Sequence, residues 1–221
     1  MSRGWSGGGS STTFVLVRHG ATEHSASKLF SGGVTGANPP LSETGIAQVE
    51  ATADWLVRSG REIDVLVTSP VRRTRESAAI LSSRLGLDVS EVVDGVAEMD
   101  FGTWDGLSFA EIRKRHGDDL DAWLGDHAVA AGGGESFKQV QKRVLAARDD
   151  LLERYAGATV AVVSHVSPIK LLAADAVGAD LDALYRMELT IASVTEIAYY
   201  ADDTGVRPSL RTFNAGPPAA Y

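Results

Sequence analysis

The chain has 221 residues, of which 44% are hydrophobic and 23% charged, a composition typical of a globular protein with one sizeable core. Its formal net charge of -8 argues against nonspecific binding to nucleic acid, because a phosphate backbone attracts basic surfaces. The absence of cysteine excludes disulfides and thiolate metal sites, and no apolar run approaches the ~18 residues of a membrane-spanning helix.

Residues 1–12 form a Gly/Ser-rich segment without the apolar stretch of a signal peptide. We expect this segment to be a flexible linker or the remainder of a tag, which suggests that something once preceded the chain. A single domain is predicted over residues 13–213, and residues 214–221 are expected to form a loose tail.

Four apolar runs have the length and β-branched content of strands, namely 14–17, 63–67, 159–163 and 193–200, and a shorter strand is expected near 91–94. Helical spacing of apolar residues follows Ser42, a predicted N-cap, and Ser136, which forms a predicted capping box with Gln139. Short helical pieces are expected at 108–115 and 118–124. Strands that alternate with helices predict an α/β fold, a three-layer α/β/α sandwich with a mostly parallel central sheet.

Polar side chains follow three of these strands directly, as the segments Arg18-His19-Gly20, Ser69-Pro70-Val71-Arg72-Arg73 and Ser164-His165-Val166. Since parallel strands end at the same edge of a sheet, two histidines and at least two arginines are expected to converge there. Ser69 and Pro70 would also suit an ordinary helix start, with Ser69 as the N-cap. That reading does not explain two arginines in the first helical turn, where cations oppose the helix dipole unless an anion is bound.

Arginine and histidine without cysteine suit the chemistry of a phosphate ester. Guanidinium groups bind phosphate oxygens in pairs, and a neutral imidazole is a competent nucleophile towards phosphorus. The leaving oxygen needs a proton, for which Glu98 is the best candidate, with Asp100 and Asp105 as weaker ones. On its position alone, Glu98 could equally be a surface carboxylate.

The segments LVRHGATE, TSPVRRTRESA, AEMDFGTWDG, GGGES and VVSHVSPIK occur in this order, and together they closely resemble the histidine phosphatase superfamily. The resemblance covers about residues 13–200 and implies a phosphoglycerate-mutase-like fold. It implies that His19 is the nucleophile that becomes phosphorylated, and that Glu98 is the proton donor and later the base. It further implies that the phosphoryl group is bound by Arg18, Arg73 and His165.

The resemblance also implies a set of substrate-binding residues: Ser25, Ser31, Gly32 and Val166. Ser25 departs from the family pattern, in which many members have asparagine at this position. A serine hydroxyl can still donate a hydrogen bond to phosphate, but over a shorter reach.

Within the superfamily the chain looks most similar to the acid-phosphatase domain of actinobacterial bifunctional ribonuclease H/acid phosphatase proteins, and to α-ribazole phosphatases. This likeness implies an attached N-terminal ribonuclease H domain. A cytoplasmic location is expected, since a chain without cysteine suits a reducing compartment. The expected partner is a small phosphorylated metabolite, with neither membrane nor nucleic acid as a partner of this domain. No cofactor or metal is expected, because His24, His116 and His127 are scattered without ligand spacing.

The sequence therefore predicts a metal-independent phosphomonoesterase of the acid phosphatase type that acts through phosphohistidine. A phosphoglycerate mutase would share the same site residues and is the first alternative. A non-catalytic module that binds a phosphorylated ligand is the second alternative, although such a module would be expected to have lost His19 or Glu98.

Overall fold

The computed structural model describes residues 11–202 and 205–217. Its sheet has six strands in the order β3-β2-β4-β1-β5-β6. The strands are β1 (Ser11–Arg18), β2 (Val65–Thr68), β3 (Val89–Val92), β4 (Thr159–Ser164), β5 (Val194–Asp202) and β6 (Gly205–Ala215). The first four are mutually parallel, whereas β5 runs antiparallel to β1, and β6 antiparallel to β5. The sheet is thus mostly parallel, as predicted.

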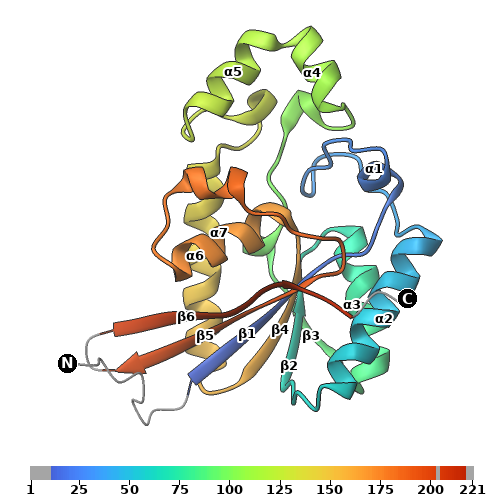
Figure 1. Cartoon of the computed structure of the whole chain (residues 1–221), viewed down its shortest axis with the longest axis vertical. Helices are drawn as coiled ribbons and strands as arrows, with labels where there is room; N and C mark the ends of the chain where they lie inside the picture. The colour runs from blue at the N-terminus through green and yellow to red at the C-terminus, as the bar shows by residue number, and fades with distance from the viewer. Residues whose placement is uncertain (1–10, 203–204, 218–221) are drawn as a thin grey trace.

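Helices cover both faces of this sheet (Figure 1). The α-helices are α1 (Glu23–Ala26), α2 (Glu43–Arg58), α3 (Arg72–Leu85), α4 (Phe109–Arg115), α5 (Gly117–Gly125), α6 (Phe137–Arg154) and α7 (Val166–Ala176). Short 3-10 turns are η1 (Asp94–Val96), η2 (Gly102–Trp104), η3 (Ala131–Gly133) and η4 (Leu181–Arg186). None of the helices in the described ranges has both the length and the apolar character that crossing a membrane requires.

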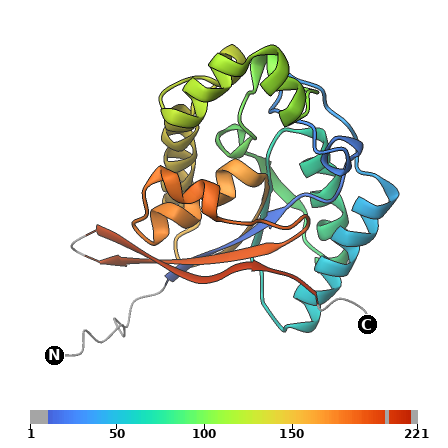
Figure 2. The ribbon, with the colours of Figure 1, turned by 45° about the horizontal axis from the view of Figure 1, so that its top comes forward.

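The alternation of side chains along the central strands builds two cores. Phe14, Leu16 and Val162 point to one face, where they pack in the larger cluster with residues of α6 and α7. Val15, Val17 and Val163 point to the other face, in a cluster with residues of α2 and α3. This is the three-layer α/β/α sandwich that the sequence predicts, with α4 and α5 set beyond the sheet in the view of Figure 2.

The helix boundaries follow the predicted caps with one exception. Ser42 caps α2, and Ser136 forms a capping box with Gln139 at α6. The interpretation of Ser69 as the N-cap of the next helix is wrong, because α3 begins only at Arg72 after Val71. Three residues separate the strand end from the helix, which leaves Ser69 at the sheet edge.

The ends of the domain also differ from the prediction. β1 already begins at Ser11, which lies in the predicted linker, and residues 1–10 lie outside the described residues. The sequence predicts no strand after residue 200, yet β6 extends to Ala215 and includes Asn214 and Ala215 of the predicted loose tail. Residues 218–221 of that tail lie outside the described residues.

Candidate active site

Three strand ends meet at one edge of the sheet, as the parallel topology requires. Arg18, the last residue of β1, is in register with Ser164, the last residue of β4. The backbone N–H of His19 donates to the Ser164 carbonyl at 3.1 Å, so that the ladder continues one residue past the strands. Ser69 joins from β2 by donating its backbone N–H to the Val163 carbonyl at 3.0 Å.

Gly20 lets the chain turn away immediately after His19. A Cβ atom at Gly20 would lie 2.3 Å from the carbonyl oxygen of Gly45 near the start of α2, so no other residue fits without a shift of backbone. The Gly20 carbonyl in turn accepts from Nδ1 of His19 at 2.7 Å. This contact places the proton of a neutral ring on Nδ1 and leaves the lone pair on Nε2.

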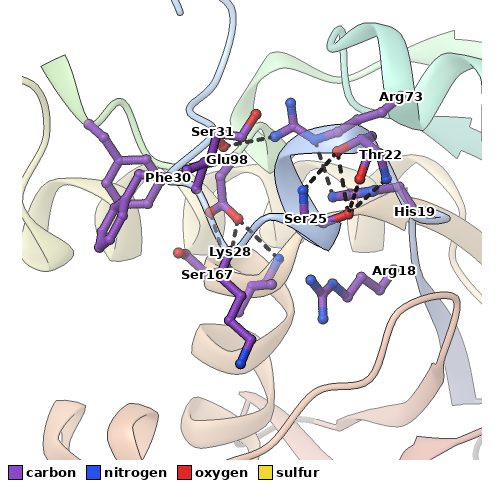
Figure 3. Close-up of a pocket in the computed structure, with 13 residues that line it drawn as sticks. Arg18, His19, Thr22, Ser25, Lys28, Phe30, Ser31, Arg73, Glu98 and Ser167 are labelled. Atoms are coloured by element: carbon purple, nitrogen blue, oxygen red, sulfur yellow. Dashed lines mark hydrogen bonds between the residues drawn. The ribbon is translucent and has the colours of Figure 1, made fainter. Parts of the chain in front are cut away.

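Arg73 lies between the two histidines (Figure 3 shows Arg73 beside His19). Its Nε donates to Nε2 of His19 at 3.1 Å, and its Nη2 lies 3.1 Å from Nδ1 of His165. The imidazole rings of His19 and His165 have centroids 5.2 Å apart. Because a guanidinium group can only donate, each imidazole must offer it a lone pair.

Ser69 completes this chain of hydrogen bonds, since its hydroxyl lies 2.7 Å from Nε2 of His165. With Nδ1 of His165 accepting from Arg73, the proton of a neutral ring is on Nε2 and is donated to Ser69. His165 is fully buried and does not line the pocket itself; it lies behind Arg73. In this structure it therefore orients the guanidinium group.

Burial and positive charge keep both imidazoles neutral. Burial is the first cause that holds the pKa of His19 well below its ordinary value, and the charges of Arg73 and Arg18 act in the same direction. Burial followed by the charge of Arg73 likewise holds the pKa of His165 well below its ordinary value. In the neutral ring of His19 the lone pair is on Nε2, where it accepts from Nε of Arg73. This unprotonated nitrogen can attack phosphorus when that hydrogen bond is released.

Each of the two arginines has a side-chain N–H donor that is not used in a hydrogen bond. Burial lowers the pKa of Arg73 to about 10, which still leaves this side chain charged at neutral pH. Its Nη1 is buried without a hydrogen-bond partner, and so is Nε of Arg18. Unsatisfied buried donors are costly, and an anion in the pocket would satisfy both. Arg18 is itself anchored, because its Nη1 donates to the carbonyl of Leu189.

Glu98 lies across the pocket from His19, beside Ser167 (Figure 3). It follows η1 and is buried, and its carboxylate accepts from three backbone N–H groups: Met99 at 2.9 Å, Val166 at 3.2 Å and Ser167 at 3.2 Å. Two of these donors belong to the first turn of α7, where the helix dipole favours an anion. A carboxyl group is thus fixed opposite the imidazole.

The pocket between these groups has a volume of about 310 Å³. It is lined by Arg18, His19, Thr22, Ser25, Lys28, Leu29, Phe30, Ser31, Arg73, Glu98, Phe101, Val166 and Ser167. Of the predicted substrate-binding residues, Ser25, Ser31 and Val166 line it. Gly32 does not; its carbonyl accepts from Nη2 of Arg73 at 3.0 Å, so that it supports the guanidinium group from behind.

The pocket wall also includes residues that the sequence does not single out as site residues, among them Thr22, Lys28, Phe30, Phe101 and Ser167. Thr22 caps the short helix α1 and its N–H donates to the Ser25 hydroxyl at 2.7 Å, a capping box that the segment TEHS could have indicated. Nothing in the sequence indicates that Phe30 and Phe101 stack edge to face, with centroids 4.9 Å apart. His24 does not line the pocket.

A neutral imidazole, two guanidinium groups with unpartnered donors and an opposing carboxyl group are chemically suited to a phosphoryl group. The chain belongs to the histidine phosphatase superfamily (branch 1), whose family model matches residues 14–210. Both the expected family and its fold are thereby confirmed.

Relatives with a name include the bifunctional protein Rv2228c of Mycobacterium tuberculosis, which is 44% identical over 202 residues and 91% of this chain, but only 54% of its own length. The chain thus spans about half the length of that relative. Phosphoserine phosphatase 1 of Hydrogenobacter thermophilus is 30% identical over 83% of this chain and 84% of the relative.

Among solved structures, a mycobacterial glucosyl-3-phosphoglycerate phosphatase in complex with VO3 has a TM-score of 0.80 at 27% identity, and the match covers 93% of this chain and 100% of the other. A putative alpha-ribazole-5'-P phosphatase from Escherichia coli has a TM-score of 0.79 at 24% identity, and the match covers 92% and 96% of the two chains. That second likeness shows the fold alone.

Proposed function

We propose that this chain is a metal-independent phosphomonoesterase that hydrolyses small phosphate esters through a phosphohistidine at His19. The observation that carries the proposal is the unprotonated Nε2 of a neutral His19, which accepts a hydrogen bond from Arg73, beside buried arginine donors that lack partners. The phosphatases among the similar proteins support the reaction class.

In the first step, Nε2 of His19 forms a bond to phosphorus while the bond from phosphorus to the ester oxygen breaks. Protonated Glu98 transfers its proton to that oxygen, and the alcohol leaves neutral. Arg18 and Arg73 donate hydrogen bonds to the phosphoryl oxygens, and this stabilises their charge in the transition state. No metal is needed to supply that positive charge.

In the second step, the Glu98 carboxylate takes a proton from water as the water oxygen bonds to phosphorus. The bond between Nε2 and phosphorus breaks, and inorganic phosphate is released. The neutral imidazole and the protonated carboxyl group are both restored. The same glutamate acts as acid and then as base, as reversal of one proton transfer allows.

We also propose a substrate class and a domain composition for the longer protein. The 54% coverage of the bifunctional relative supports the interpretation that this domain is one part of a longer protein, for which we propose an N-terminal ribonuclease H domain. We propose a small metabolite as substrate, since a pocket of about 310 Å³ is at the lower end of ligand-sized pockets.

A panel of phosphate monoesters tests this function. It includes 4-nitrophenyl phosphate, glycerol 2-phosphate, phosphoserine and 3-phosphoglycerate, the last with and without a 2,3-bisphosphate primer, and each is assayed with and without EDTA. We expect release of inorganic phosphate that is independent of the primer and of EDTA. Primer-dependent isomerisation without release of phosphate would instead identify a mutase. Several relatives that are 34% identical over 134 residues are named phosphoglycerate mutases. Phosphate binding without turnover would identify a binding module.

A further inference from the structure

Arg143 of α6 contacts the backbone that carries Glu98. Its Nη1 donates to the carbonyls of Gly95 at 2.9 Å and Ala97 at 2.8 Å, and its Nη2 donates to the carbonyl of Glu98 itself at 3.0 Å. The segment from 97 to 101 lies between two short 3-10 turns and has no strand ladder to hold it. The guanidinium group of Arg143 therefore supplies the hydrogen bonds that a neighbouring strand would otherwise make to the backbone leading to Glu98.

Glu135, in the segment GGGES, holds this guanidinium group from the other side. Its Oε1 accepts from Nε of Arg143 at 2.8 Å, and its Oε2 accepts from Nη2 at 2.8 Å, which makes a two-pronged ion pair. Oε2 also accepts from the backbone N–H of Asp100 at 3.0 Å, and the N–H of Glu135 donates to the Asp100 carbonyl at 2.7 Å. The Arg143–Glu135 pair is thus hydrogen-bonded to the backbone on both sides of Glu98.

The ion pair is partly buried, with side chains 24% and 26% exposed. Burial alone would raise the pKa of Glu135, but the hydrogen bonds from Arg143 and from the Asp100 amide outweigh it and hold that pKa below its ordinary value. The Glu135 carboxylate therefore stays charged at neutral pH. Charge-assisted hydrogen bonds with this forked geometry are the stronger kind.

The position of the Glu98 carboxylate depends strongly on these backbone contacts of Arg143 and Glu135. Among the residues that the structure describes, its hydrogen-bond donors are the backbone amides of Met99, Val166 and Ser167, and no side chain there donates to it. The place of the carboxyl group is then set by the path of its own backbone relative to the start of α7. Small displacements of a reacting group are costly in rate, because proton transfer needs hydrogen-bond distance.

We propose that Arg143, held by Glu135, is a positioning residue for proton transfer by Glu98 to the leaving oxygen. The proposal rests on the proposed phosphomonoesterase function and adds to it a residue that touches neither substrate nor phosphate. Arg143 is absent from the pocket wall, so a direct effect on phosphate binding is not expected.

The experiment compares R143K with the unaltered chain on an alkyl ester, glycerol 2-phosphate, and on an aryl ester, 4-nitrophenyl phosphate. Lysine keeps the charge but cannot reach three carbonyls and both carboxylate oxygens together. We expect kcat/KM for the alkyl ester to fall about 30-fold, a part of the ~10²–10⁴ that acid–base catalysis contributes, while the aryl ester changes little because its leaving group needs no proton. The affinity for inorganic phosphate should stay unchanged.

Arg148→Lys provides the control, since Arg148 lies on the same helix, is 18% exposed and pairs with Asp149 and Asp175 away from Glu98. It should leave both esters unchanged. If R143K does not fold, E135Q takes its place, because glutamine weakens the contacts of the Arg143–Glu135 pair without removing a side-chain acceptor.

A double-mutant cycle with Glu98→Gln separates positioning from general support of the fold. In the E98Q background the R143K change should have no further effect on the alkyl ester, because the proton it positions is gone. Equal slowing of both esters by R143K, or a full additive loss in the E98Q background, would overturn the positioning proposal and leave the proposed function intact. If the unaltered chain hydrolyses neither ester, the proposed function fails and the positioning proposal fails with it.

Discussion

The two halves of the pocket are built by different means. His19 and His165 directly follow buried parallel strands, and Arg73 enters from the start of α3 beside them. Glu98 instead stands in a segment of 3-10 turns and loops, held by Arg143 and Glu135. We call the part of the site around His19, His165 and Arg73 the phosphate half, and the part around Glu98 the acid half. The strand register at the sheet edge fixes the phosphate half, whereas the acid half depends on contacts between segments that are remote in sequence. The first should tolerate changes in its surroundings better than the second.

The same contrast appears where the two loops of the acid half cross. Gly102 has φ +54 and Gly132 has φ +55, and a Cβ atom at Gly102 would lie 2.2 Å from the carbonyl oxygen of Gly132. Only glycine combines the left-handed backbone with so close an approach. The loop around Glu98 and the loop before Glu135 are therefore packed backbone against backbone.

The proposed nucleophile provides the largest expected effect. His19→Ala removes the atom that we propose bonds to phosphorus, and we expect turnover of every ester to fall on the order of 10⁴-fold or more, as for other nucleophile deletions. The fold should persist, because the ladder around residue 19 is made by backbone atoms. Steady-state rates measure the loss of turnover, and thermal unfolding measures whether the fold persists. Retained turnover would exclude a covalent intermediate at His19.

Arg73 tests the phosphate half next. Arg73→Ala removes the donors to both imidazoles and the free Nη1, and we expect kcat to fall about 10²–10³-fold for alkyl and aryl esters alike. The control is Arg72→Ala, because Arg72 is the exposed neighbour, 54% exposed, that pairs with Glu76. Its turnover should match that of the unaltered chain. If Arg72→Ala were the slower variant, the assignment of the clamp to Arg73 would be wrong.

Glu98→Gln tests the acid half and separates it from the phosphate half. The amide keeps its size but cannot donate the proton that a poor leaving group needs. We expect about a 10²-fold loss in kcat/KM for glycerol 2-phosphate and a much smaller one for 4-nitrophenyl phosphate, because kcat/KM reports the first step and not the later hydrolysis of the phosphohistidine. The slope of rate against leaving-group pKa is the measurement. An equal loss for both esters would point to a different proton donor.

The difference between the halves also explains what could be predicted from the sequence. Arg18, His19 and His165 follow apolar runs directly, so strand periodicity alone places them on one edge. The position of Glu98 makes it a candidate acid but equally a surface carboxylate, and the resemblance to the family selects it. Arg143 cannot be predicted, since nothing local marks an arginine in the middle of an amphipathic helix. The antiparallel strand β6 was missed because its side chains alternate poorly between buried and exposed.

The smallest expected effect concerns stability against pH, and it belongs to the phosphate half. Burial first, and the charges of Arg73 and Arg18 next, hold the pKa of His19 well below its ordinary value in the folded chain. The unfolded chain binds that proton near pH 6.5, so the unfolded state holds more protons than the folded state below this pH. Stability is therefore full above about pH 6.5 and falls as the pH drops towards the lower folded value.

We expect the free energy of unfolding in urea to fall by about 1 kcal/mol for each of His19 and His165 between about pH 7.5 and about pH 5.5. His19→Ala should lose about half of that dependence, since His165 is held neutral by the same burial and by Arg73. An unchanged pH dependence in His19→Ala would mean that the ring is not held neutral in the folded chain. The phosphate half would then lack the lone pair on which the attack depends.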